Sequence, residues 1–192
     1  MQVHVLSDKQ LLGQYMSGNE AALETLISRH KEKIYTSILF LVKDHALAED
    51  IFQDTFIKVI GTLRSGKYKE EGKFLPWVMR ISYNLCIDHF RRQKRTPTIT
   101  NSDGYDIFNI LKFADGSAED DMIRDQTRKK VRKLIDQLPV EQREVVILRH
   151  YSELSFKEIA EMTNVSINTA LGRMRYALIN MRKMIAEKNV SM

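Results

Sequence analysis

The sequence has few residues that break helices and almost none that cross-link a chain. Among its 192 residues are three prolines, eight glycines and a single cysteine, Cys86. One thiol excludes an internal disulfide framework and any zinc site built on several thiolates. No apolar run approaches the roughly 18 residues that a membrane span needs, and the N-terminus, with His4, Ser7 and Asp8, shows no export signal. These absences predict a cytosolic globular protein.

Signals of enzyme chemistry are also missing. The sequence contains no glycine-rich phosphate loop, no nucleophile elbow and no cluster of His, Cys, Asp and Glu with metal-ligand spacing. Its five histidines are scattered, and Cys86 falls on the inner side of a predicted helix, where a thiol is buried and inert. We therefore expect no catalytic residue, no metal and no cofactor.

Charge divides the chain into three parts. The formal net charge is +5, which allows a nucleic-acid partner without requiring one. Residues 1–95 carry a net +4, residues 96–122 a net −5 and residues 123–192 a net +6. This pattern predicts two domains joined by an acidic linker. Because the linker also holds six apolar side chains between Tyr105 and Phe113, we expect part of it to dock, either on its own domains or on a partner.

Helical periodicity dominates both predicted domains, and no stretch alternates like a β-strand. In the first domain, Ser7, Asn19 and Asp44 can each cap a helix. The third helix is expected to end at Gly61, and a fourth to run from about Leu75 to Arg92 with a proline in its first turn. The fold class predicted is all-α.

The second domain shows the pattern of a helix-turn-helix. Ser155 and Glu158 form a capping box, Asn164 can take the left-handed turn conformation, and Ser166 can cap a long helix. The wedge between the two helices is expected to be filled by Ile159, Val165 and Leu178. Polar residues near the start of the long helix suit a major groove: Asn168, Thr169, Arg173 and Arg175. A helical hairpin with a solvated basic face is the alternative.

The fourth helix carries a polar row at 3-4 spacing, formed by Arg80, Asn84, Asp88, Arg91 and Arg92. Its apolar side is expected to hold Val78, Ile81 and Leu85. The loop before it is basic, with Lys67, Tyr68 and Lys73. Basic groups beside aromatics suit unstacked single-stranded bases. Tyr68 is the better stacking residue, because a tryptophan after a helix-starting proline, as at position 77, is more often part of the core.

The third helix places acidic and amide groups opposite its core side. Ile51, Phe52, Thr55 and Val59 can pack inward, while the other face presents Asp50, Gln53, Asp54 and Lys58. Phe56 and Ile57 are expected close to that polar face. An apolar residue among acids is typical of a hot spot for a basic helical partner, although ordinary amphipathicity gives the same pattern.

Taken together, these motifs resemble a bacterial alternative sigma factor of the extracytoplasmic function (ECF) group, over nearly the whole chain. The segment from Ala48 to Phe56 resembles the helix that grips the coiled coil of the polymerase beta-prime clamp. The segment from Phe74 to Arg92 is similar to the helix that reads the minus-ten promoter element. The segment Leu138–Arg143, with the helix-turn-helix after it, looks like the domain that reads the minus-thirty-five element.

The resemblance implies a role for each set of residues. The clamp helices would be contacted by Asp50, Gln53, Asp54, Phe56 and Lys58. The minus-ten element would be held by Lys67, Tyr68, Lys73, Arg80, Asn84, Asp88, Arg91 and Arg92. The minus-thirty-five major groove would receive Ser166, Asn168, Thr169, Arg173 and Arg175. The implied partners are core RNA polymerase, through its beta-prime clamp helices and beta flap, promoter DNA, and a membrane-associated anti-sigma factor.

The chain departs from the family pattern at the helix-turn-helix. Ala170, Leu171 and Gly172 stand where many members have valine, lysine and serine, and Asn164 replaces the usual turn glycine. Two other functions are compatible with parts of the chain. A stand-alone helix-turn-helix regulator that binds duplex operators as a dimer accounts for the second domain only. An adaptor that binds polymerase without reading DNA leaves the basic residues near 168–175 without a role.

Overall fold

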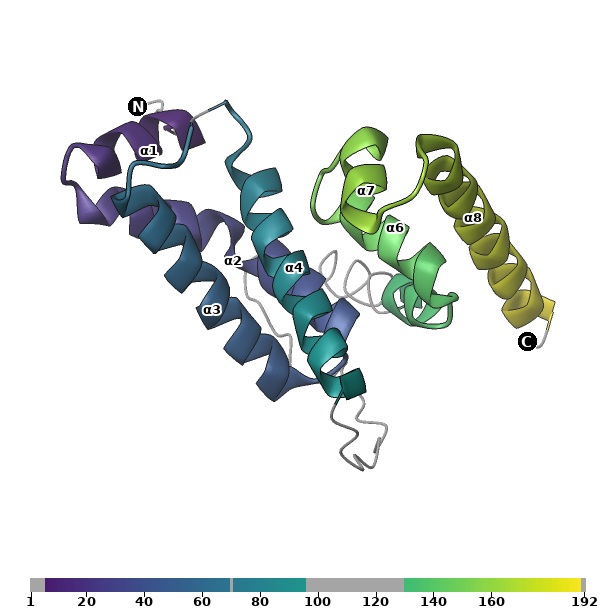
Figure 1. Ribbon diagram of the computed structural model, residues 1–192. Helices are drawn as coiled ribbons and strands as arrows, with labels where there is room; N and C mark the ends of the chain where they lie inside the picture. The colour runs from purple at the N-terminus through teal and green to yellow at the C-terminus, as the bar shows by residue number, and fades with distance from the viewer. Residues whose placement is uncertain (1–5, 70, 96–129, 191–192) are drawn as a thin grey trace, which may run out of the picture. The chain divides into compact units, whose positions relative to one another are not determined.

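The computed structural model describes residues 6–69, 71–95 and 130–190, and every regular element among them is a helix. This confirms the all-α prediction. The chain separates into two compact units, one containing α1–α4 and the other α6–α8 (Figure 1). The predicted linker, residues 96–122, lies outside the described residues. Within the described ranges, no helix is both long and apolar enough to cross a membrane.

The first unit is built from α1 (Asp8–Met16), α2 (Glu20–Val42), α3 (His45–Arg64) and α4 (Phe74–Arg95). Its caps follow the sequence signals: Ser7 forms a capping box with Gln10, and the Asp44 side chain accepts from Leu47 N at 3.0 Å. Asn19 is the N-cap of α2 but makes no side-chain cap bond. α3 continues past Gly61 to Arg64, because Leu63 in its last turn is buried and packing outweighs the glycine penalty of about 1 kcal/mol.

In the first unit α2 is the central helix and packs against α1, α3 and α4. The largest fully buried side chains here include Leu26, Ile34, Leu63, Phe74 and Met79. They come from three different helices, so the bundle has one shared core.

The buried face of α4 differs from the predicted one. Val78 is buried as expected, but Ile81 and Leu85 are half-buried. The inner residues are Phe74, Leu75, Val78, Met79, Ser82, Tyr83 and Cys86. Because α4 packs against both α2 and α3, its buried stripe is wide and is rotated from the one that apolar spacing suggests. The burial of Cys86 is confirmed, and desolvation raises the pKa of its thiol to about 12, so it stays protonated.

The second unit contains a helical segment over residues 130–136, then α6 (Val140–His150), α7 (Phe156–Thr163) and α8 (Ile167–Val190). The capping box at Ser155 is confirmed, and Asn164 ends α7 in the predicted left-handed conformation, with φ 54°. α8 packs against both α6 and α7.

The prediction that Leu178 of α8 fills the wedge of the helix-turn-helix is wrong. Leu178 is 46% exposed, whereas Ala170 and Ala177 are fully buried. These alanines lie two turns apart on the inner line of α8, and residue 178 is turned by about 100° from residue 177. Small side chains on this line let α8 approach α6 and α7 closely; Ile159 and Ala160 of α7, a helix that packs against α8, are also buried.

Candidate protein and nucleic-acid interfaces

The exposed face of α3 carries the predicted polar residues. Asp50, Gln53, Asp54 and Lys58 are all exposed. Asp44 fixes the start of this helix, and Ala48, Ile51 and Val59 are buried on its other side. The result is a rigid helical surface with an acidic and amide character, which can meet a basic helical partner.

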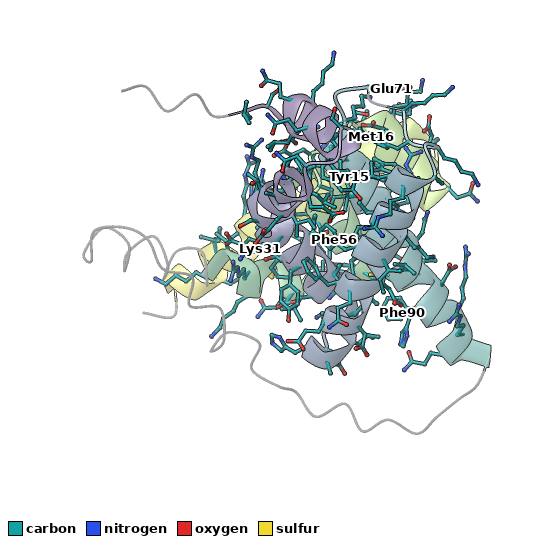
Figure 2. All side chains as sticks on the ribbon, turned by 90° about the vertical axis from the view of Figure 1, so that its left-hand side faces the viewer. Tyr15, Met16, Lys31, Phe56, Glu71 and Phe90 are labelled. Atoms are coloured by element: carbon teal, nitrogen blue, oxygen red, sulfur yellow. The ribbon has the colours of Figure 1, made fainter. Side chains whose placement is uncertain are left out.

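Two adjacent apolar residues on α3 differ sharply in solvent exposure. Ile57 is 67% exposed, and Phe56 is only 8% exposed, with its ring 4.9 Å from that of Phe52. Figure 2 shows Phe56 among the helices of the bundle. The expectation that both lie close to the polar face is therefore wrong for Phe56, whose side chain is buried in the core of the bundle. Ile57 lies three residues after Asp54 and is the apolar residue of this surface, a placement that helical spacing alone could have assigned.

The loop from Ser65 to Lys73 leads from α3 into α4 and carries an aromatic cluster. The Tyr68 ring lies 4.3 Å from the Trp77 ring and 6.4 Å from that of Phe74. Phe74 is buried, whereas Tyr68 and Trp77 are half-buried. Trp77 is thus neither a full core residue nor an open platform, because one of its sides is covered by Tyr68. Stacking by either ring on a base would use the outer part of this cluster.

The predicted polar row of α4 lies on one exposed face. Its members are all exposed: Arg80, Asn84, Asp88, Arg91 and Arg92. Lys67 and Lys73, in the loop before the helix, are exposed as well. Asp88 and Arg91 form an ion pair at 3.6 Å, which solvent screens because both side chains are at least half exposed. The structure therefore places the amide of Asn84 among basic groups, an arrangement that can hold a base edge and its phosphates.

The start of α8 is fixed by Ser166. Thr169 N donates to Ser166 Oγ at 3.0 Å, and the two hydroxyl oxygens lie 2.8 Å apart. The Ser166 hydroxyl thus caps the N-terminus of α8. Asn168 and Thr169 follow it in the first turn and are exposed.

The two arginines predicted for the major groove are in different environments. Arg175 is exposed, but Arg173 is half-buried, and its guanidinium lies 4.0 Å from the Glu144 carboxylate on α6. Two turns further along α8, the Asn180 amide donates to the side chain of Gln142, also on α6, at 2.8 Å. The line that contains Arg173 is therefore the side of α8 that faces its own domain, whereas Arg175 is on a side open to solvent.

The structure also exposes residues on α8 that sequence reasoning missed. Tyr176, next to Arg175, is 61% exposed. An apolar stripe with seven-residue spacing runs along α8 and is formed by Leu171, Leu178 and Ile185, each 43–46% exposed. The heptad spacing was a visible signal of this stripe. It gives α8 a second apolar face besides the one packed on α6 and α7.

Comparisons with known proteins identify both units. Residues 26–96 match the family model "Sigma-70 region 2", and residues 128–175 match "Sigma-70, region 4". The RNA polymerase sigma-H factor of Pseudomonas aeruginosa is 29% identical over 86% of this chain and 87% of its own length. The ECF RNA polymerase sigma factor SigW of Bacillus subtilis is 27% identical over 93% and 97%.

Two solved structures share the fold. CnrH, in complex with the cytosolic domain of CnrY, has a TM-score of 0.60 at 20% identity and covers 94% of this chain and 97% of its own. The sigma factor RpoE of Bartonella quintana, in complex with the anti-sigma factor NepR, has a TM-score of 0.62 at 21% identity, covering 85% and 96%. With regions 2 and 4 matched in order and relatives aligned over most of both chains, the chain belongs to the ECF family of sigma-70-type RNA polymerase sigma factors, which are non-catalytic transcription initiation factors.

Proposed function

We propose that this sigma factor uses three exposed surfaces for three contacts. The face of α3 with Asp50, Asp54 and Ile57 binds the beta-prime clamp helices of core polymerase. The loop from Ser65 to Lys73 and the polar row of α4 hold the opened non-template strand of the minus-ten element. The exposed side of α8 around Arg175 reads the minus-thirty-five element. The observation that supports this most is the α4 row, where Asn84 and Asp88 lie one turn apart among exposed basic groups.

Energetics support the α3 contact. Burying a whole Ile side chain contributes about 1.5–3 kcal/mol, so an Ile57 that is 67% exposed in the free chain has most of this to gain. Asp50, Gln53, Asp54 and Lys58 surround it with charges and amides that fix orientation and association rate. Phe56 contributes from beneath: it is buried, its ring contacts Phe52 on the same helix, and the Phe52 ring lies 6.0 Å from Tyr35 of α2, which holds α3 against the bundle.

We further propose an anti-sigma partner that covers the α3 surface and the apolar stripe of α8. The complex of RpoE with NepR supports this partner class, and the complex of CnrH with a cytosolic domain of CnrY supports a membrane-associated form of it. The stripe is the right kind of surface, because exposed apolar residues at heptad spacing pack against an amphipathic helix. We expect the chain to act in the cytoplasm, where core polymerase and promoters are.

The test is run-off transcription with purified core polymerase, this chain and a library of random upstream sequences. Specific transcripts that require the chain are expected, and their sequences give both promoter elements. Tight binding to duplex DNA without binding to core would instead favour the stand-alone regulator. Binding to core with no transcript at any sequence would favour the adaptor.

A further inference from the structure

The loop that is proposed to read the minus-ten element is supported by α1 and the first half of α2. In Figure 1 the chain between α3 and α4 passes beside α1. The loop contains Gly66 and Gly72, with φ of 67° and 72°, so two of its positions have backbone conformations that favour glycine. A loop with this freedom holds one shape only if side chains on neighbouring elements fix it.

The centre of this support is Asp8, in the first turn of α1. Asp8 Oδ1 accepts from Arg29 Nη1 at 2.6 Å, and Asp8 Oδ2 lies 2.7 Å from His30 Nε2. Arg29 also donates to the Leu6 carbonyl at 2.7 Å. The His30 side chain is only 11% exposed, so its position is set by these contacts and by its packing. One carboxylate therefore joins the start of α1 to two consecutive residues of α2.

His30, which is held by Asp8, is connected to the loop through a series of aromatic contacts. Its ring lies 6.0 Å from the ring of Phe74, the first residue of α4. The Phe74 ring is 5.9 Å from Trp77, and both rings contact Tyr68 in the loop. The contacts thus run without a break from Asp8, through His30 and Phe74, to a loop residue proposed to touch DNA.

The other end of the loop is tied to the same two helices. Arg64, just before the loop, lies 3.5 Å from Glu20 at the start of α2. The pKa of Arg64 is raised, first by its interaction with Tyr15 of α1 and then by the charge of Glu20. Figure 2 shows Glu71 of the loop on the same side of the unit as Tyr15 and Met16. Both ends of the loop therefore lie beside α1 and the first half of α2; the contact through Phe74 is buried, whereas the Arg64–Glu20 pair, 66% and 76% exposed, is the weaker one.

We propose that Asp8 and His30 are positioning residues for minus-ten recognition. Neither needs to touch DNA: they fix Phe74 and, through it, the aromatic cluster and the loop, in the form that holds the unstacked base. The proposal rests on the minus-ten role given above to the loop and α4. A loop fixed in advance loses less entropy on binding, and it discriminates better between bases because a mismatched base cannot be accommodated by rearrangement.

The first test uses the free protein and needs neither polymerase nor DNA. Trp77 is the single tryptophan of the chain, so its fluorescence reports the aromatic cluster alone. Asp8→Asn and His30→Leu are expected to shift the Trp77 emission to longer wavelength and to increase its quenching by acrylamide, with helical content unchanged. Asp44→Asn is the matched control, because it removes the same charge at a helix start while the amide oxygen can still accept from Leu47 N. An emission identical to wild type in both variants would overturn the proposal.

The second test measures base discrimination by the holoenzyme. The probe is a fluorescent single-stranded minus-ten oligonucleotide, of the sequence recovered from the random library, compared with one changed at the captured base. We expect Asp8→Asn and His30→Leu each to lower the ratio of the two dissociation constants about threefold to tenfold, with core affinity unchanged. The double variant should lose no more than His30→Leu, because both residues act through one contact.

A purely structural role gives a different result. In that case the affinity for core and the melting temperature fall together with oligonucleotide binding, and the discrimination ratio stays at its wild-type value; this would overturn the positioning role. If the wild-type holoenzyme itself did not discriminate between the two oligonucleotides, the minus-ten assignment would fail, and this proposal with it. If the wild-type holoenzyme discriminates between the two oligonucleotides and both variants discriminate equally well, the minus-ten assignment stands and only the positioning proposal is overturned.

Discussion

The two units of this sigma factor position their binding residues by different physical means. In the first unit, large side chains such as Leu26, Phe74 and Met79 fill a core shared by several helices, and the exposed faces of α3 and α4 are set by that packing. In the second unit, the inner line of α8 carries the small residues Ala170 and Ala177. Its orientation depends on close helix approach, on the cap and turn at its start and on polar bridges to α6.

The difference predicts which substitutions disturb the binding residues of each unit; a cavity among Ile147, Leu148 and Ile159 would be costly in the second unit as well. A cavity in the first unit removes packing from several helices at once, so its cost is large. A change at a cap or turn in the second unit affects one junction, so its cost is about 1 kcal/mol. The predictions below test this contrast, beginning with the largest effect.

The strongest contrast within the first unit is between Phe56 and Ile57. Phe56→Ala is expected to lower the free energy of unfolding by about 3–5 kcal/mol, because it leaves a cavity against Phe52. Ile57→Ala should change it by less than about 0.5 kcal/mol, since Ile57 is exposed. Denaturant unfolding followed by Trp77 fluorescence reports this unit alone.

For binding to core polymerase, the direct effect of Ile57→Ala should be larger than that of Phe56→Ala, the reverse of their order for stability. Ile57→Ala is expected to weaken binding to core polymerase about tenfold, equivalent to ~1.4 kcal/mol of lost burial. Equal loss of stability for the two substitutions would contradict the assignment of Phe56 to the core and Ile57 to the surface.

Reversing a charge on α3 tests the surface without touching the core. Asp54→Arg is expected to weaken core binding at least about a hundredfold, because a like charge facing a basic partner costs several kcal/mol. Asp54 is exposed, so the melting temperature should hardly move. Glu32→Arg, at an exposed position of α2, is the matched control. Normal core affinity in Asp54→Arg would remove α3 from the proposed interface.

The sequence was sufficient for features that depend on a few neighbouring residues. The caps at Ser7, Asp44 and Ser155, and the left-handed turn at Asn164, were all predicted and are confirmed. Each one requires only a polar side chain within hydrogen-bond reach of a backbone group two or three residues away, or a residue type that tolerates positive φ. Such features are set before any helix meets another.

The rotation of each helix could not be predicted in the same way. Phe56 and Ile57 are neighbours of similar hydropathy. The three-residue spacing from Asp54 favours Ile57 as the exposed one, but how deeply Phe56 is buried depends on the packing of α3 on α2 and α4. The same holds for Leu178 against Ala177 on α8. The contact between Asp8 and His30, 22 residues apart, left no sequence signal because each residue alone is an ordinary polar side chain. The roles given to the interface residues remain predictions.

The two arginines of α8 test whether helix rotation also decides DNA reading. Arg175→Ala is expected to weaken binding to the minus-thirty-five element by about 1–3 kcal/mol and to relax base preference there. Arg173→Ala should act less on base preference, because its guanidinium lies 4.0 Å from Glu144 within the domain. The measurement is transcription from promoters with single-base changes in that element. A larger loss of preference in Arg173→Ala would show that this side chain leaves Glu144 to read DNA.

The smallest effect concerns the turn before α8. Asn164→Ala is expected to destabilise the second unit by about 1–2 kcal/mol, because a side chain with a Cβ pays this cost in the left-handed region. Asn164→Gly removes that cost and should be neutral or slightly stabilising. The difference belongs to the second unit, so it should appear in far-ultraviolet circular dichroism and not in Trp77 fluorescence. A loss seen equally by both probes would mean that the two units unfold as one, and the contrast between them would then lie in their packing alone.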